Sequence, residues 1–453
     1  MLATFLPQMM DEFTVKQSLP KHPVVGEFME NFGGDQNMVA SEGAAWKKWR
    51  SAFNPGFSAS HLMTMVPAIV DQCAIFSSLM ADHAKKNDLF RMETAATRLT
   101  VDIIGKIVLD TALKSQSGPN ELVSAFISQT RWQPIGVQFR PLELIDFRIP
   151  FVQAWNNYRM NRYIGRCLDE RFAQRQTQDS GKRQKHVIDL ALEAYLKEVK
   201  GTSTADISKV TSIDPAFRKA AIANVKTFVF AGHDTTSSTI CYCYYYMSKT
   251  PSILAKVRAE HDEVFGSDPT ATPDLLKEDG RLLNNLPYTT AVIKEVLRLQ
   301  PPASTIRLGQ PGFFVHDPTT GEPIKTEGMM LWPVDTGLHR SPLWSPDPHT
   351  FRPERFLDPS SNKDAYAPFS RGPRNCIGQE LAMIETKVIL AMTARSFDFE
   401  ARFDEIEKLK GDGSGYPSET EGVQSQWGEE AYQIQLGTAK PREGMPCRLR
   451  ERK

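Results

Sequence analysis

The chain has 453 residues, and its 54 basic and 54 acidic side chains leave no net charge. This balance gives no electrostatic reason to expect nucleic acid as a partner. Six scattered cysteines are unlike a secreted disulfide framework, and no apolar run reaches the roughly 18 residues that a membrane span needs.

Apolar residues recur mainly at three- and four-residue intervals, which predicts a mainly α protein. Strand-like alternation is short and concentrated in residues 305–331 and near the C-terminus, so we expect only small β-sheets. Two polar segments, residues 174–186 and 411–430, are predicted to be surface loops.

The longest predicted helix begins at the N-cap Asp214, has Pro215 at its first position and ends at Lys249, before Thr250 and Pro251. Cys241 and Cys243 lie within it. We interpret them as packing residues, because no second cysteine pair lies nearby to complete a metal site.

The middle of this helix reads Ala-Gly-His-Asp-Thr-Thr at residues 231–236. Glycine and competing polar side chains lower helix propensity, so we expect a local defect in the helix, with small residues leaving room for a ligand. Thr227, Ala231 and Thr235 are spaced by four and share one face. A polar kink in a buried helix is the alternative interpretation.

A further helix is predicted over residues 288–300, where Glu295 and Arg298 are three apart on one face. Their flanking residues are apolar, which indicates that the pair turns inward. Pro301 and Pro302 end the helix, and the prolines between residues 342 and 353 exclude regular structure there.

Residues 369–378 read Phe-Ser-Arg-Gly-Pro-Arg-Asn-Cys-Ile-Gly and precede a helical pattern. Gly372 and Gly378 let the backbone approach a flat macrocycle, and Arg374 places a positive charge near Cys376. The helix N-terminus also favours negative charge on sulfur. The segment therefore predicts a thiolate offered to a haem iron; the alternative is a buried structural cysteine.

These residues match every fixed position of the haem-binding signature of the cytochrome P450 family, Phe-x-x-Gly-x-Arg-x-Cys-x-Gly. Residues 231–236 resemble the central-helix motif of the same family. The resemblance extends from Trp46 to the C-terminal segment 437–446 and implies the cytochrome P450 fold. It implies one domain over residues 1–453 that holds haem b, with Cys376 as the iron ligand.

The resemblance also implies roles for individual residues. Asp234 and Thr235 would deliver protons for the cleavage of dioxygen. Glu295, Arg298 and Arg355 would form a buried structural ion triad. The implied haem contacts are Trp46, Arg50, Ala231, Arg307, Phe369, Gly372, Arg374, Cys376 and Gly378, with Trp46, Arg50 and Arg307 at the propionates. Four regions would line the substrate pocket: the stretch before Trp46, and residues 129–161, 230–235 and 303–306.

By resemblance, the chain is a monooxygenase that inserts one oxygen atom of dioxygen into a small organic substrate. Its electrons would come from NADPH–cytochrome P450 reductase. The chain looks most like fungal microsomal members, which implies secondary-metabolite biosynthesis at the cytosolic face of the endoplasmic reticulum. Two alternatives are a haem-thiolate isomerase or dehydratase acting on a peroxide, against which the Asp234–Thr235 pair argues, and a non-catalytic haem-binding sensor.

The N-terminal part is shorter than the resemblance implies, because only residues 1–45 precede Trp46. Similar eukaryotic enzymes place a membrane helix, a proline-rich hinge, a first helix and the opening strands there. We expect either a sequence that lacks this part or a natural variant with a reduced first sheet, which would be cytoplasmic.

Overall fold

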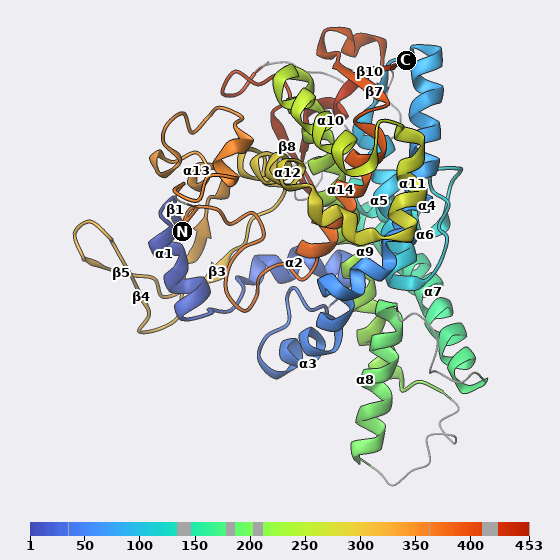
Figure 1. Cartoon of the computed structure of the whole chain (residues 1–453). Coiled ribbons are helices and arrows are strands. Elements are labelled where there is room, and N and C mark those ends of the chain that lie inside the picture. The colour runs from blue at the N-terminus through green and yellow to red at the C-terminus, as the bar shows by residue number, and fades with distance from the viewer. Residues whose placement is uncertain are drawn as a thin grey trace. The chain divides into compact units, whose positions relative to one another are not determined.

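The computed structural model describes residues 1–34, 36–133, 146–177, 186–202, 212–361, 363–409 and 425–452. Helices dominate these residues and the strands are short (Figure 1), which confirms the predicted mainly α architecture. The helices are α1 (Pro7–Asp11), α2 (Pro23–Gly33), α3 (Gly43–Phe53), α4 (Ala59–Lys86), α5 (Met92–Leu109), α6 (Glu121–Arg131), α7 (Arg148–Thr177), α8 (Val187–Thr202), α9 (Pro215–Lys249), α10 (Pro251–Phe265), α11 (Thr272–Glu278), α12 (Pro287–Leu299), α13 (Asp335–Leu338) and α14 (Gln379–Thr393).

The described strands form four small sheets. They are β1 (Leu2–Thr4), β2 (Phe90–Arg91), β3 (Arg307–Leu308), β4 (Phe314–His316), β5 (Pro323–Lys325), β6 (Met330–Pro333), β7 (Phe397–Ala401), β8 (Gln433–Leu436), β9 (Thr438–Pro441) and β10 (Pro446–Glu451). One sheet has the order β1-β6-β3, with β1 parallel to β6, and another has the order β2-β10-β7. The pairs β4-β5 and β8-β9 are antiparallel. Strands therefore occur in both predicted regions.

The chain divides into two compact units. Unit 1 comprises Met1–His22, Met63–Leu99 and Asp234–Lys453, and unit 2 comprises Pro23–Leu62 and Thr100–His233. All the described strands belong to unit 1, whereas the described elements of unit 2 are helical. One haem domain over residues 1–453 stays a prediction.

Helix α9 begins and ends as predicted. Oδ1 of Asp214 accepts hydrogen bonds from the backbone N–H groups of Ala216 and Phe217, at 3.0 and 2.9 Å. This side chain satisfies N–H groups that have no partner within the helix, and Pro215 has no N–H to satisfy. The helix ends at Lys249, and α10 begins at Pro251.

The local defect predicted at residues 231–236 does not interrupt α9, which continues through them. Nearby hydroxyls donate to the helix carbonyls instead of disrupting the helix. Thr100 Oγ1 donates to the carbonyl of His233 at 3.0 Å, Ser237 Oγ to that of Asp234 at 3.0 Å, and Thr239 Oγ1 to that of Thr235 at 3.1 Å. Tertiary packing and these extra bonds outweigh the low local propensity.

The first predicted loop begins later than expected, because α7 continues to Thr177. The rest of that loop, residues 178–185, lies outside the described residues. Most of the second, residues 410–424, does so as well.

Among the described helices, α4 is the one whose length and composition would allow it to cross a membrane, with a hydropathy of 1.5 over its most apolar window. Its residues Met65, Ile69 and Phe76 are completely buried, and Pro67 lies inside it. A core helix meets the same criteria, so this is weak evidence for a span. The predicted absence of a span stays a prediction.

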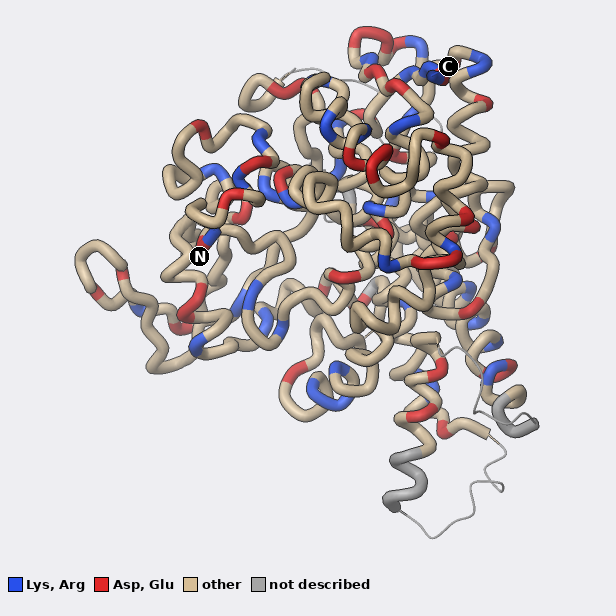
Figure 2. Tube along the Cα trace, viewed as in Figure 1, with Lys and Arg blue, Asp and Glu red and all other residues tan. Residues whose placement is uncertain are grey.

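Charges of both signs are interspersed along the chain (Figure 2). Many are paired: in unit 2, Arg171 on α7 contacts Asp110 at 3.0 Å and Asp189 at 2.7 Å. Such mixing agrees with the neutral composition and with the absence of a compositional reason for nucleic-acid binding.

Candidate functional site

The loop before Cys376 is closed by its own backbone. The N–H of Cys376 donates to the carbonyl of Phe369 at 2.9 Å, and the N–H of Asn375 donates to that of Gly372 at 3.1 Å. Helix α14 starts at Gln379, with Gly378 at the N-cap position. Cys376 therefore lies just before a helix N-terminus, as predicted.

The same loop rests on the N-terminal segment of the chain. Gly372 has a φ of 76°, and a Cβ at this position would collide with the carbonyl oxygen of Thr14. Thr14 belongs to a π-helical turn, Glu12–Lys16, that follows α1. Next to the glycine, Arg371 forms an ion pair with Asp11 at 3.0 Å. Gly372 is required both for its left-handed backbone conformation and for this close approach.

Cys376 differs from the other five cysteines, all of which lie in described parts of the chain. It is exposed, whereas Cys167 is half-buried and the other four are buried. Burial raises the pKa of Cys73, Cys241, Cys243 and Cys447, which keeps these four as neutral thiols. Cys376 is thus the cysteine best placed to bind an added group.

In unit 1, Arg307 lies on β3 and is completely buried, with Nη1 donating to the carbonyl of Leu19 at 3.1 Å. A guanidinium removed from water is stabilised by anions, which suits a haem propionate. Phe369 and Arg374 in the cysteine loop are half-buried. In unit 2, Trp46 and Arg50 lie one turn apart on α3, and both are half-buried.

The central part of α9 is unusually open. Ala231 is exposed and Gly232 and Thr235 are half-buried, although α9 is buried immediately before this point and again after it. An exposed position within a buried helix leaves room for an added group on that face. Thr227 shares the face but is buried, with its hydroxyl donating to the carbonyl of Ala223 at 2.9 Å.

Gly232 does not provide the expected room for a ligand. A Cβ there would lie 2.8 Å from Cδ1 of Ile104 on α5, so the missing side chain lets these two helices of unit 2 pack closely. Sequence reasoning attributed the space to a ligand because it could not identify the neighbouring helix.

Asp234 is held by the C-terminal hairpin within unit 1. Its Oδ2 accepts from the backbone N–H of Thr438 at 3.0 Å and from the Thr438 hydroxyl at 2.7 Å. Its Oδ1 lies 2.6 Å from Nζ of Lys440, which also lies 2.5 Å from Oε1 of Glu93. Sequence reasoning missed these partners, because they come from distant segments and match no local motif.

Two of the regions predicted to line a substrate pocket meet in unit 2. Phe230 on α9 stacks on Phe32 of α2 with ring centroids 4.2 Å apart, and it also contacts Phe28. In unit 1, Ala303 and Ser304 are exposed. Residues 134–145, inside the second predicted region (129–161), lie outside the described residues.

Glu295, Arg298 and Arg355 come together as predicted. Arg298 binds both carboxylate oxygens of Glu295, at 2.7 and 2.8 Å, and Nε of Arg355 lies 3.3 Å from Glu295 Oε1. Both arginines also donate to carbonyls of the proline-rich segment, including those of Pro346 and Pro348. These bonds fasten the proline-rich segment to α12. The segment has 3-10 turns at Pro342–Trp344 and Pro353–Phe356, so the prediction that regular structure is excluded there was wrong at both ends.

His339 extends this network to the cysteine segment. It is fully buried: Nδ1 donates to the carbonyl of Arg298 at 3.0 Å, and Nε2 accepts from the N–H of Ala367 at 3.0 Å. Burial lowers the pKa of His339 to about 3, so the ring is neutral and can both donate and accept. Ala367 is two residues before Phe369, so the network supports the start of the cysteine loop.

We expect the Arg298→Met variant to lose about 3–5 kcal/mol of unfolding free energy, because it leaves the buried Glu295 carboxylate without its bidentate partner. Urea unfolding followed by circular dichroism measures this. Arg281→Met is the control: Arg281 is 78% exposed and pairs with Asp279 on the surface, so the loss there stays below about 1 kcal/mol. Equal losses in the two variants would contradict a structural role for the triad.

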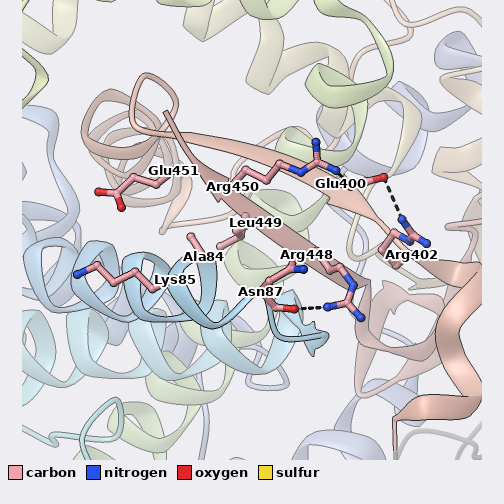
Figure 3. Close-up of a pocket in the computed structure, with 9 residues that line it drawn as sticks. All are labelled: Ala84, Lys85, Asn87, Glu400, Arg402, Arg448, Leu449, Arg450 and Glu451. Carbon is pink, nitrogen blue, oxygen red and sulfur yellow. Dashed lines mark hydrogen bonds and ion pairs between the residues drawn. The ribbon is translucent and has the colours of Figure 1, made fainter. Parts of the chain in front are cut away.

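A surface pocket of about 550 Å³ lies in unit 1, by the end of α4 and strands β7 and β10 (Figure 3). Its arginines have partners in the same wall: Arg402 and Arg450 pair with Glu400 at 3.1 and 3.3 Å, and Arg448 donates to the carbonyl of Asn87. None of the predicted site residues lines this pocket, so we do not assign it to the active site.

A model of the cytochrome P450 family matches residues 2–421, so the chain belongs to this family. It is 39% identical to cytochrome P450 monooxygenase polC of Polytolypa hystricis, over 99% of this chain and 79% of that protein. Cytochrome P450 monooxygenase acrF of Aspergillus aculeatus is 37% identical, over 94% and 86% of the two chains. Human cytochrome P450 4Z1 is 30% identical, over 84% and 74%.

Membership places the chain among haem-thiolate oxidoreductases, with haem as cofactor and a cysteine as iron ligand. The residues fit this cofactor. In unit 1, an exposed cysteine lies at a helix N-terminus and a buried arginine lies on β3. In unit 2, a buried helix exposes Ala231.

Proposed function

We propose that the chain is a cytochrome P450 monooxygenase that inserts one oxygen atom of dioxygen into a small organic substrate. Its electrons come from NADPH through NADPH–cytochrome P450 reductase. The observation that carries the proposal is the pair formed by the buried, ion-paired Asp234 and the half-buried Thr235. A haem-thiolate isomerase has no use for such a pair, because it does not deliver protons to dioxygen.

When bound, the haem supplies the redox chemistry of dioxygen activation. We propose that Cys376 is its iron ligand, with the α14 N-terminus and Arg374 stabilising the thiolate. Arg307 would neutralise one propionate and Arg50 the other, and the motif of Arg50 implies that the indole N–H of Trp46 donates a hydrogen bond to the same propionate as Arg50. The other proposed contacts are Ala231, Phe369, Gly372 and Gly378.

Thr235 and Asp234 handle protons in this proposal. The Thr235 hydroxyl holds a proton at Oγ1 and passes it on, and the Asp234 carboxylate receives protons at an oxygen and restores the hydroxyl. Asp234 is buried and pairs with the Lys440 ammonium at 2.6 Å, which supports a role in handling charge away from bulk water. Lys440 and Thr438 contact both oxygens of Asp234, so in this proposal Asp234 exchanges one of these bonds when it acts.

The biological setting is proposed from the relatives. Two are fungal proteins whose names describe them as cytochrome P450 monooxygenases. We therefore propose a fungal secondary-metabolite pathway and a location at the cytosolic face of the endoplasmic reticulum, or in the cytoplasm if the natural protein has no anchor.

Reconstitution with haem, NADPH and the reductase tests the proposed function. Small molecules that shift the Soret band on binding are first selected from a chemically diverse set. They are then incubated under ¹⁸O-labelled dioxygen, and we expect NADPH consumption and one labelled oxygen atom in each product. Rearrangement of a peroxide without reductase would indicate the isomerase or dehydratase, and ligand binding without turnover would indicate the sensor.

A further inference from the structure

Three buried charged side chains of unit 1 form a cluster. The proposed function gives a role to only one of the three, Asp234. Lys440 on β9 is 9% exposed, and Glu93 on α5 and Asp234 on α9 are each 4% exposed. The ammonium lies 2.5 Å from the Glu93 carboxylate and 2.6 Å from the Asp234 carboxylate. One cation is therefore shared between two buried anions.

The contacts differ between the two carboxylates. Both oxygens of Asp234 are engaged, one by Lys440 and one by Thr438. Oε1 of Glu93 accepts from Lys440 and from the Thr97 hydroxyl, at 2.5 and 2.9 Å. Glu93 is thus a second anionic partner of the Lys440 ammonium, in addition to Asp234.

Lys440 remains charged in this cluster. Burial alone would lower the pKa of the ammonium, but Asp234 and Glu93 raise it above its ordinary value. Because the raised pKa lies above the unfolded value, the contribution of Lys440 to stability is complete below about pH 10 and is lost only above that. The ammonium therefore changes partners without changing protonation at neutral pH.

We propose that Glu93 is a positioning residue for Asp234 and acts through Lys440. The inference rests on the proposed role of Asp234 in proton delivery. When Asp234 releases Lys440 to serve Thr235, Glu93 still neutralises the ammonium, so no buried charge is left without a partner. Without the Glu93 carboxylate, Asp234 is the single anionic partner of the Lys440 ammonium in this cluster. Lys440 then holds Asp234 more tightly.

The test uses the haem-loaded protein and the variant Glu93→Gln, which keeps the shape of the side chain and removes its charge. We expect a several-fold rise in the share of NADPH electrons released as hydrogen peroxide, and a larger solvent deuterium effect on product formation. Glu93→Asp keeps the charge and should restore most of the coupling. It also serves as the second variant if Glu93→Gln does not fold.

Asp189→Asn is the matched control. Asp189 is a buried carboxylate on α8 paired with Arg171 at 2.7 Å, and it belongs to unit 2. We expect this variant to lose stability as Glu93→Gln does, and to keep wild-type coupling. If Glu93→Gln also keeps wild-type coupling and deuterium effect, the inference is overturned and Glu93 is a structural residue.

A second measurement does not depend on turnover. Lys440→Met leaves two buried carboxylates together, so one of them must bind a proton on folding. The folded state then holds more protons than the unfolded state, and thermal stability should fall as the pH rises from 5 to 8 relative to wild type. If the thermal stability of Lys440→Met and of wild type changes with pH in the same way, the two carboxylates are not coupled through Lys440. This result overturns the inference.

Asp234→Asn separates this inference from the proposed function. If Asp234→Asn uncouples and Glu93→Gln does not, only the inference fails. If neither Asp234→Asn nor Thr235→Ala uncouples, the proposed proton delivery fails and the inference fails with it.

Discussion

We expect the Cys376→Ser variant to lose the far-red-shifted Soret band of the reduced, carbonyl-bound haem completely. Only a thiolate opposite the carbonyl produces that shift, because it pushes electron density onto iron, and a serine hydroxyl does not. Cys376 is the exposed cysteine in the chain. Difference spectra of the dithionite-reduced, carbonyl-treated protein measure the band, and bound haem is quantified separately.

Cys167→Ser is the control for this experiment. Cys167 is half-buried, which makes it the next most accessible cysteine, and it lies on α7 in unit 2. We expect this variant to keep the full band. A band that persists in Cys376→Ser and disappears in Cys167→Ser or another cysteine variant would show that Cys376 is not the iron ligand.

We expect the Thr235→Ala variant to bind haem normally and to release most of its electrons as hydrogen peroxide. In the proposed mechanism the Thr235 hydroxyl delivers protons and does not hold the cofactor, so product formation should fall by about 100-fold, the lower end of the range for acid–base groups. NADPH consumed, peroxide released and product formed are measured together with the reductase present.

Thr239→Ala is the matched control, one helical turn further along α9. Its hydroxyl donates to the carbonyl of Thr235 at 3.1 Å, so removing it changes a backbone contact and leaves the Thr235 side chain in place. Coupling should remain close to wild type. Unchanged coupling in Thr235→Ala itself would remove this residue from the mechanism and favour the peroxide isomerase.

The elements that could be predicted from the sequence are those fixed by local signals. Asp214 and Pro215 define the start of α9, and Pro251 defines its end because proline cannot continue a helix. Glu295 and Arg298 could be paired because their spacing on α12 places them on one face. The cysteine loop, residues 369–378, could be recognised because the haem-binding signature requires particular residue types at fixed positions.

What could not be predicted depends on segments that are distant in sequence. Asp234 meets Lys440 across about 200 residues, and no spacing rule connects them. The same limitation applies to the low helix propensity at the middle of α9. The hydroxyl of Thr100, on α5, donates a hydrogen bond to the carbonyl of His233, and the sequence does not reveal this contact. Helix propensity describes an isolated helix, whereas in the folded protein the packed neighbouring segments decide whether the helix continues.

If Cys376 binds the haem iron as proposed, the close approach of Gly372 to Thr14 couples the beginning of the chain to the segment that carries the iron ligand. The cysteine loop lies against the Glu12–Lys16 turn, and Arg371 is tied to Asp11. A protease cut or a bulky fusion near these residues would therefore register in the absorption spectrum of the haem, without touching a haem contact. Purification tags are accordingly better attached at the other terminus.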